Sequence, residues 1–169
     1  SYFPKGTPLV SFDDDVREFI RLDEKDPSRM RALRPDELAP LLDFGFEECK
    51  RVGAHLWGDY PVPNAFFMSN TISYDLKFII GSFWGCFNPG KDIQIDIGNG
   101  EKEDYIRTIH FWERDHKIVR LNFLSHKTAY YSEPGGMQSD GMQARIDRQK
   151  AVVDVMLKRW PQYIRSNPK

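Results

Sequence analysis

The stretch of residues 104–126 constrains the fold most, because apolar and polar side chains alternate along it on both sides of Asp115-His116. An alternation with a period of two is typical of half-buried strands, and two residues are enough to connect a hairpin. We therefore predict an antiparallel hairpin whose turn lies at Asp115 and His116. Side chains that face each other across such a ladder share one face of the sheet. One face of this hairpin then carries Thr108, His110, Trp112, Val119, Leu121 and Phe123.

His110 is the clearest candidate for a catalytic role on that face, because its neighbours there are nearly all apolar. A buried imidazole that finds no hydrogen-bond partner costs about 1–3 kcal/mol. Burial also lowers the pKa of the ring and keeps it neutral, which is the state that a general base needs. Two interpretations follow. His110 is either a core histidine bonded to a backbone carbonyl or to Tyr74, or the acid–base group of an enzyme.

Helices are predicted for the N-terminal part of the chain. Ser11 or Asp13 can cap a first helix by accepting hydrogen bonds from its free backbone N–H groups. The acidic residues 13–15 would then lie in its first turn, where the helix dipole favours negative charge, and a metal cluster is the alternative interpretation. A second helix is predicted from Pro35 to Leu56, because apolar residues recur there every three or four positions.

Strands are predicted further along, where the period of the apolar residues changes to two. Residues 72–80 and 93–97 alternate in this way, and Gly98-Asn99-Gly100 favours a tight hairpin turn. A final amphipathic helix is predicted over residues 139–160, before a proline that ends it.

The order of these elements predicts an α+β fold, in which helices are segregated from an antiparallel sheet. We expect N-terminal helices, a meander sheet of four or more antiparallel strands, and a C-terminal helix packed on that sheet. Residues 1–169 are expected to form a single globular domain, with residues 1–10 as an extended N-terminal arm. No apolar run approaches the ~20 residues of a membrane helix, so a soluble protein without a membrane partner is expected. Cytoplasmic residence is the default expectation, although a chain that starts at Ser1 leaves a removed signal peptide open.

The net charge of −1 argues against a nucleic-acid partner, but the charge is unevenly distributed along the chain. Residues 1–104 hold 12 basic and 19 acidic side chains, whereas residues 105–169 hold 12 basic and 6 acidic ones. Two solvated faces of opposite sign would explain this split. A basic patch for an acidic protein surface is the alternative, and it would be formed by Arg107, Arg114, Lys117, Arg120 and the final helix.

No motif predicts a metal or a cofactor. His110, Glu113 and His116 have a spacing that suits a helix, but on the predicted hairpin the first two point to opposite faces. Cys49 and Cys86 form no CxxC pair, so structural thiols are expected, with a single disulfide left open. The sequence also lacks a nucleophile elbow and a phosphate-binding loop.

The lack of a reactive constellation favours a non-catalytic binding module, such as an inhibitor, an immunity-type protein or a regulatory protein that docks onto another protein. Aromatic and arginine side chains are the usual anchors of such interfaces. The loop predicted at residues 57–67 is rich in aromatic residues and proline, and it either plugs the core or lines a binding site. The candidate binding residues are Trp57, Tyr60, Tyr74, Trp112, Arg107, Arg114, Lys117, Arg120, Tyr130 and Tyr131.

A small-molecule enzyme or carrier is the alternative function. Residues 15–33, from Asp-Val-Arg-Glu-Phe to Arg-Met-Arg-Ala-Leu, resemble the paired opening helices of the NTF2-like superfamily, and residues 111–119 resemble its closing strand hairpin. The chain departs from that family in its long final helix and in lacking a clear early strand. The resemblance implies a cone-shaped pocket for a small molecule, with His110 as the acid–base group and Tyr74 and Trp112 as pocket wall.

Overall fold

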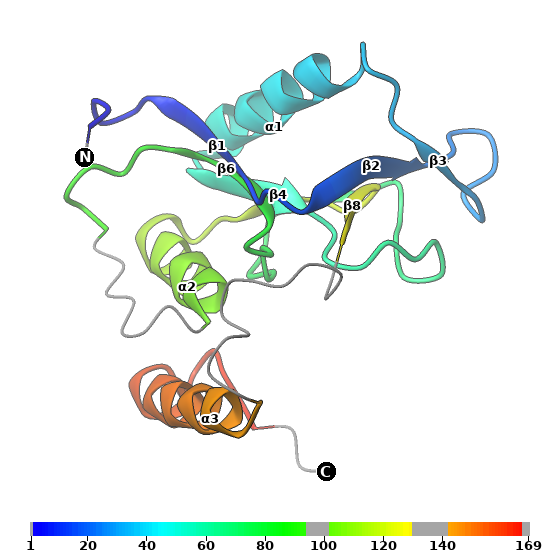
Figure 1. Cartoon of the computed structure of the whole chain (residues 1–169). Coiled ribbons are helices and arrows are strands. Elements are labelled where there is room, and N and C mark those ends of the chain that lie inside the picture. Colours follow the sequence, from blue (N-terminus) through cyan, green and yellow to red (C-terminus); the bar gives the residue numbers. More distant parts are fainter. Residues whose placement is uncertain (1, 94–101, 130–141, 167–169) are drawn as a thin grey trace.

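The computed structural model describes residues 2–93, 102–129 and 142–166, which form an α+β fold (Figure 1). An α+β fold is therefore confirmed, although the arrangement of its elements differs from the predicted one. The elements in chain order are β1 (Pro8–Phe12), β2 (Val16–Leu22), β3 (Met30–Ala32), α1 (Leu38–Val52), β4 (Leu56–Asp59), β5 (Ile72–Ser73), β6 (Phe83–Phe87), α2 (Glu103–Asp115), β7 (Val119–Leu121), β8 (Leu124–Thr128) and α3 (Met142–Arg159).

A mixed five-stranded sheet forms the centre of the molecule, with the strand order β1-β6-β4-β7-β5. β4 and β7 run parallel, and the other neighbouring pairs are antiparallel. All four residues of β4 are buried. Successive side chains of a strand point to opposite faces, and Leu56 and Trp57 accordingly pack into two different clusters of the core.

Two helices cover the two faces of this sheet (Figure 1). α1 packs on one face, where Leu41 and Cys49 join Trp57 in a buried cluster. α2 packs on the opposite face, where Phe111 meets Leu56. A second sheet, β3-β2-β8, is antiparallel, and it continues from the first through the Asn122-Phe123 turn between β7 and β8.

The hairpin predicted for residues 104–126 is wrong. Residues 103–115 form α2, and His116 ends this helix in the left-handed region with φ 50°, its N–H bonded to the Trp112 carbonyl. α2 has apolar contacts on two sides, with Phe111 against the sheet and Ile109 against α3. A helix buried on two sides has apolar residues at positions that a single amphipathic stripe leaves polar, and this pattern mimics the alternation of a strand.

The first predicted helix is also wrong, because residues 8–22 form the two strands β1 and β2. The predicted N-terminal arm is shorter for the same reason, since β1 begins at Pro8. The acidic residues 13–15 therefore lie in the turn between two strands, without a helix dipole to complement. The predicted strand over 72–80 is reduced to Ile72–Ser73, and the predicted loop at 57–67 begins inside the buried strand β4.

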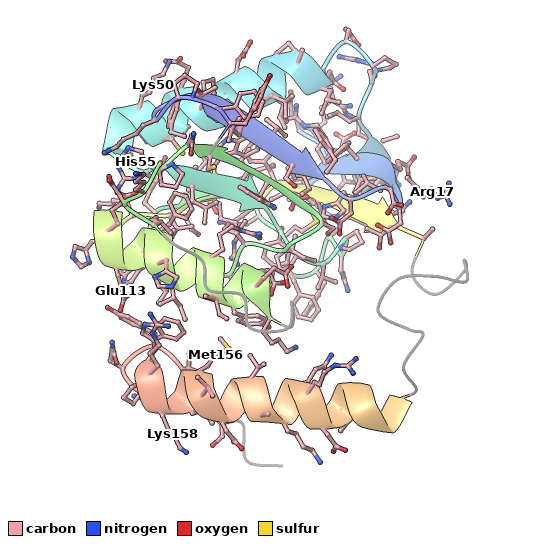
Figure 2. The ribbon with its side chains drawn as sticks, turned by 60° about the vertical axis from the view of Figure 1, so that its left-hand side comes forward. Arg17, Lys50, His55, Glu113, Met156 and Lys158 are labelled. Atoms are coloured by element: carbon pink, nitrogen blue, oxygen red, sulfur yellow. The ribbon has the colours of Figure 1, made fainter. Side chains whose placement is uncertain are left out.

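Two predicted helices are confirmed. α1 lies within the predicted range, and Gly53 with φ 76° ends it. α3 occupies most of the predicted final helix, but it packs on α2 rather than on the sheet, through Met156 and Trp160. In Figure 2 Met156 points towards α2, whereas Lys158 points away from it. The predicted strand at 93–97 and the Asn-Gly turn lie almost entirely outside the described residues.

None of the helices in the described ranges is both long enough and apolar enough to cross a membrane.

Candidate active site

A serine, a histidine and an aspartate meet where the two sheets join. Asp59 is the last residue of β4, and Ser82 directly precedes β6. β4 and β6 are antiparallel neighbours, with Gly58 opposite Trp84, so the end of one strand lies beside the start of the other. His126 comes from β8 in the second sheet. Three segments that are distant in sequence thus place three polar side chains at one point in the core.

The three side chains form one hydrogen-bonded chain. Ser82 Oγ lies 2.6 Å from His126 Nε2, and His126 Nδ1 lies 2.7 Å from Asp59 Oδ2. An ionised carboxylate only accepts hydrogen bonds, so Nδ1 carries the proton in that state. The Nε2 atom of the neutral ring then accepts the hydrogen bond that the Ser82 hydroxyl donates. These are the bonds by which a Ser–His–Asp triad activates its nucleophile.

The site is enclosed in the core. Asp59 is 0% exposed, His126 4% and Ser82 7%, so the serine is the member nearest to solvent. The rings of Phe19 and Phe83 both lie 6.1 Å from the imidazole, centroid to centroid. These aromatic walls hold the His126 ring in one orientation, which a histidine base requires.

Burial raises the pKa of Asp59 to about 6, although the hydrogen bond and the charge of His126 act in the opposite direction. The second oxygen, Oδ1, has no hydrogen-bond partner among the described residues. At pH 7 the carboxylate is thus mostly ionised, with its negative charge directed at the imidazole. An ionised, buried aspartate stabilises the imidazolium that forms when His126 takes a proton.

His55 and Asp115 form a second histidine–aspartate pair that lacks this chemistry. His55 Nδ1 lies 3.1 Å from Asp115 Oδ2, but Arg114 Nη2 lies 3.1 Å from His55 Nε2. Because an arginine always donates, the Nε2 lone pair of His55 is already used and cannot accept a proton from a nucleophile. Figure 2 places His55 near the edge of the molecule, at the start of β4.

His110, the predicted acid–base residue, lies in α2 and faces α3. Its ring is 5.5 Å from that of Trp160, and its Nδ1 is 4.0 Å from a Glu113 oxygen. Burial lowers the pKa of His110, and the charge of Arg159 lowers it further. His110 is half-buried and the expected lowering of its pKa is present, but its Nε2 has no partner among the described residues. The predicted partner Tyr74 is bonded to Glu48 and Arg51 instead.

Those predicted binding residues that the structure describes do not form one surface. Trp57 is fully buried under α1, and Arg107 is 4% exposed and stacks on Trp84 at 4.1 Å. Arg114 pairs with Asp115 and lies near Asp92, and Arg120 stacks on Tyr60. Tyr74 binds Glu48 near α1, Trp112 is half-buried on α2, and Lys117 is exposed. Tyr130 and Tyr131 lie outside the described residues.

The two cysteines are buried free thiols. Burial raises the pKa of Cys86 to about 11 and that of Cys49 still further. Both thiols therefore stay protonated at neutral pH, and a thiolate nucleophile is not available from them. Among the residues that the structure describes, no group of three or more metal-ligating side chains comes together.

Sequence reasoning missed the triad because its members are far apart in the chain. Ser82 and His126 are separated by 44 positions, and Asp59 and His126 by 67. His126 has no partner at a local spacing, and Ser82 lacks a nucleophile elbow. A signal was present in the strand Leu56–Asp59, whose last residue is a charged side chain that follows three buried ones. A charge at the end of a buried strand needs a partner, and this requirement predicts a polar site there.

Comparison with protein families, with curated proteins and with solved structures finds no match to this chain. The two motifs that resemble the NTF2-like superfamily also have a different structure here. The predicted opening helices are β2 and β3, and the predicted closing hairpin is the end of α2 followed by β7. The cone-shaped pocket that this resemblance implied therefore has no support from either motif.

Proposed function

We propose that the protein is a serine-dependent hydrolase or acyltransferase with Ser82 as its nucleophile. One observation carries this proposal: Ser82 Oγ, His126 and Asp59 are bonded in series at 2.6 and 2.7 Å, in the order that acyl transfer needs. A serine–histidine bond alone leaves the tautomer of the ring open, but the aspartate on Nδ1 fixes the tautomer that makes Nε2 a base.

The reaction follows from this order of bonds. Ser82 Oγ attacks the carbonyl carbon of an ester, thioester or amide while its proton passes to His126 Nε2. The C–O, C–S or C–N bond then breaks, and the leaving group takes that proton from Nε2. A water molecule, deprotonated by His126, attacks the acyl-serine, and the proton returns to Ser82 when the acid leaves. Asp59 remains ionised throughout and stabilises the imidazolium.

Arg107 is the candidate for stabilising the negative charge on the tetrahedral intermediate. Its Nη2 donates to the Ile80 carbonyl at 3.4 Å, two residues before the nucleophile. Its Nε has no hydrogen-bond partner among the described residues, although the side chain is almost fully buried. A positive charge with an unused donor is the kind of group that binds a developing oxyanion.

The proposal predicts that a biotinylated fluorophosphonate attaches covalently to the folded protein and that peptide mass spectrometry locates it on Ser82. Ser82→Ala abolishes the attachment, because no other described serine bonds to an imidazole. Ser125→Ala is the matched control, since Ser125 is also buried, precedes His126 and donates to the Tyr60 carbonyl instead. The control variant keeps the label. A folded wild-type protein that takes no label, or takes it elsewhere, contradicts the proposal.

Protein binding is the second candidate function, and an exposed aromatic surface favours it. Phe66 is 86% exposed and Phe67 58%, in the loop that follows β4. Ser69 N–H bonds to the Asn122 carbonyl at 3.1 Å, which holds this loop beside Phe123. Large apolar side chains that gather on a surface in this way are typical of docking sites.

A groove of about 360 Å³ lies between α1 and the Phe123 turn, with Pro40, Leu41 and Phe44 among its lining residues. Asp36 stands at its rim, with its side chain 80% exposed. We propose that a partner protein inserts an apolar side chain between Phe44 and Phe123 and places a basic side chain against Asp36. Arg34 lies 3.7 Å from Asp36 and Arg21 also lines the groove, so the basic side chain of the partner competes with Arg34 for Asp36.

This second proposal predicts that a photo-crosslinking amino acid at position 66 captures one partner protein, and that Asp36→Arg lowers the capture several-fold. Lys50→Glu, a charge reversal at the exposed far end of α1, serves as the control and leaves the capture unchanged. Capture that is insensitive to Asp36→Arg, or no capture in the native source, counts against this surface as a docking site.

A further inference from the structure

β1 is an edge strand of the five-stranded sheet, and β6 is its neighbour on the inner side (Figure 1). At the two ends of β1, the Thr7 carbonyl accepts a bond of 2.8 Å from segment 82–88, and the Asp13 N–H donates one of 2.9 Å to it. The residues that bond to β6 are therefore the odd-numbered ones. In an antiparallel ladder the residues between them direct their N–H and C=O groups away from the neighbouring strand. Val10 and Phe12 thus present their backbone groups at the outer edge of the sheet.

These outward groups of Val10 and Phe12 have no hydrogen-bond partner among the residues that the structure describes. An open strand edge is a template for another strand, and charged side chains, bulges or short edges usually protect it. The segment Pro8–Phe12 carries no charge, and its register with β6 is uninterrupted. By contrast, β3 carries Arg31, β8 carries Lys127, and β5 is only two residues long. β1 is thus the least protected edge in the described part of the chain.

Two copies of β1 are complementary when they pair antiparallel around Val10. Val10 then exchanges two hydrogen bonds with Val10 of the other copy, and each Phe12 N–H donates to a Pro8 carbonyl. Pro8 has no N–H, so its outward position leaves no donor without a partner. Residues that face each other across a ladder share one face of the sheet. The ring of Phe12, which is 45% exposed, therefore covers Pro8 of the other copy.

The charges that flank β1 favour the same pairing. Lys5 precedes the strand and the carboxylates of residues 14–15 follow it. Antiparallel pairing around Val10 brings Lys5 of each copy to the acidic turn of the other, whereas a centre shifted by one residue would bring Lys5 opposite Arg17. Lys5 lies 2.6 Å from Asp92, but its side chain is 60% exposed and an ammonium group has three donors. Lys5 can therefore bond to the turn of the second copy as well.

We infer that β1 is a dimerisation edge and that its partner is a second copy of this chain. The two five-stranded sheets then form one continuous sheet across a twofold axis at Val10. Such an interface is closed, because it uses the same edge of both copies. The inference is independent of the reaction proposed for Ser82. An interface centred on a strand of five residues is small, so we expect a dissociation constant of roughly 10–1,000 µM.

Amide hydrogen exchange, measured by NMR over a dilution series, tests this pairing residue by residue. The amides of Val10 and Phe12 become protected as the protein concentration rises, because each donates to the other copy. Leu9 and Ser11 are internal controls, since their amides face β6 and stay protected at every concentration. Light scattering on the same samples gives the mass. A protein that stays monomeric up to about 1 mM, or a dimer in which Val10 and Phe12 exchange freely, overturns the inference.

Charge reversal provides a second test. Lys5→Glu and the double change Asp14→Lys with Asp15→Lys each weaken the dimer about tenfold, because both charge contacts across the axis become repulsive. A mixture of these two variants regains the wild-type affinity, since the reversed charges are complementary in the mixed dimer. Lys50→Glu on α1 is the control and leaves the dimer unchanged. Equal weakening by the control, or a mixture as weak as the separate variants, contradicts the pairing around Val10.

Discussion

Asp59→Asn is expected to lower the rate of fluorophosphonate labelling at Ser82 by about 10³–10⁴-fold. The asparagine side chain has a donor and an acceptor, and with its amide nitrogen in the place of Asp59 Oδ2 it bonds to His126 Nδ1 once that atom loses its proton. The ring proton then moves to Nε2, which donates to Ser82 Oγ instead of accepting from it. The hydroxyl keeps its place beside the ring, but the base that should take its proton is gone. The rate is measured as the growth of the labelled mass with time.

The stability of the same variant should depend on pH differently from that of the wild-type protein. Because Asp59 has a folded-state pKa raised to about 6, the folded state binds its proton more tightly than the unfolded chain does. Its contribution to stability is therefore fully present below about pH 4 and is lost as the pH rises through about 6. Asp59→Asn removes this pH dependence, which is read as the wild-type minus variant difference in the free energy of unfolding in urea.

The labelling rate of the wild-type protein should show the opposite trend with pH. It falls as the pH drops below about 6, because protonated Asp59 no longer stabilises the imidazolium. A variant that is stable and folded but labels at the wild-type rate would mean that Asp59 serves only as a link between the two sheets. This result would contradict the proposal that Ser82 is an activated nucleophile.

The sequence predicts a helix best where only one face of that helix is buried. α1 has a single buried stripe, including Leu41 and Cys49, and its period of 3.6 predicts the helix directly. The pattern of α2 resembles that of a strand because the sheet and α3 bury this helix from two sides, so Phe111 and Ile109 are both apolar. The short run of residues 103–115 cannot reveal how many neighbours a helix will have. That information comes from the tertiary arrangement.

The triad could not be derived from the sequence for a related reason. His126 meets Ser82 only because β8 crosses from the end of β7 into the second sheet, beside the carboxyl end of β4. No local spacing encodes this crossing. The charge split along the chain was misleading in the same way, since Arg107 from the basic half is buried beside Asp104 from the acidic half. Charges that are separated along the chain are thus brought together by the fold.

Gly85→Ala is expected to destabilise the protein by about 1–3 kcal/mol or more, as overpacking of a dense core does. Trp57 is fully buried, and it lies between Gly85 on β6 and Gly45 on α1. A methyl group at Gly85 would overlap Trp57 Nε1 and Cε2 and would lie 2.7 Å from Cζ2. The indole is enclosed from both sides, because a methyl group at Gly45 would lie 2.5 Å from Cδ2. Urea unfolding, followed by tryptophan fluorescence and by circular dichroism, gives the free-energy change.

A double-mutant cycle tests whether this overlap is the cause. Trp57→Phe removes the part of the indole that the new methyl group would meet, together with an N–H that has no partner among the described residues. The double variant should therefore be more stable than the sum of the two single changes predicts, by about 1 kcal/mol or more. Strict additivity would show that Gly85 is needed for the strand backbone and not for the indole. Since Trp57 pairs with Gly85 two residues before Asp59, the same packing sets the end of β4 and thereby the position of the triad.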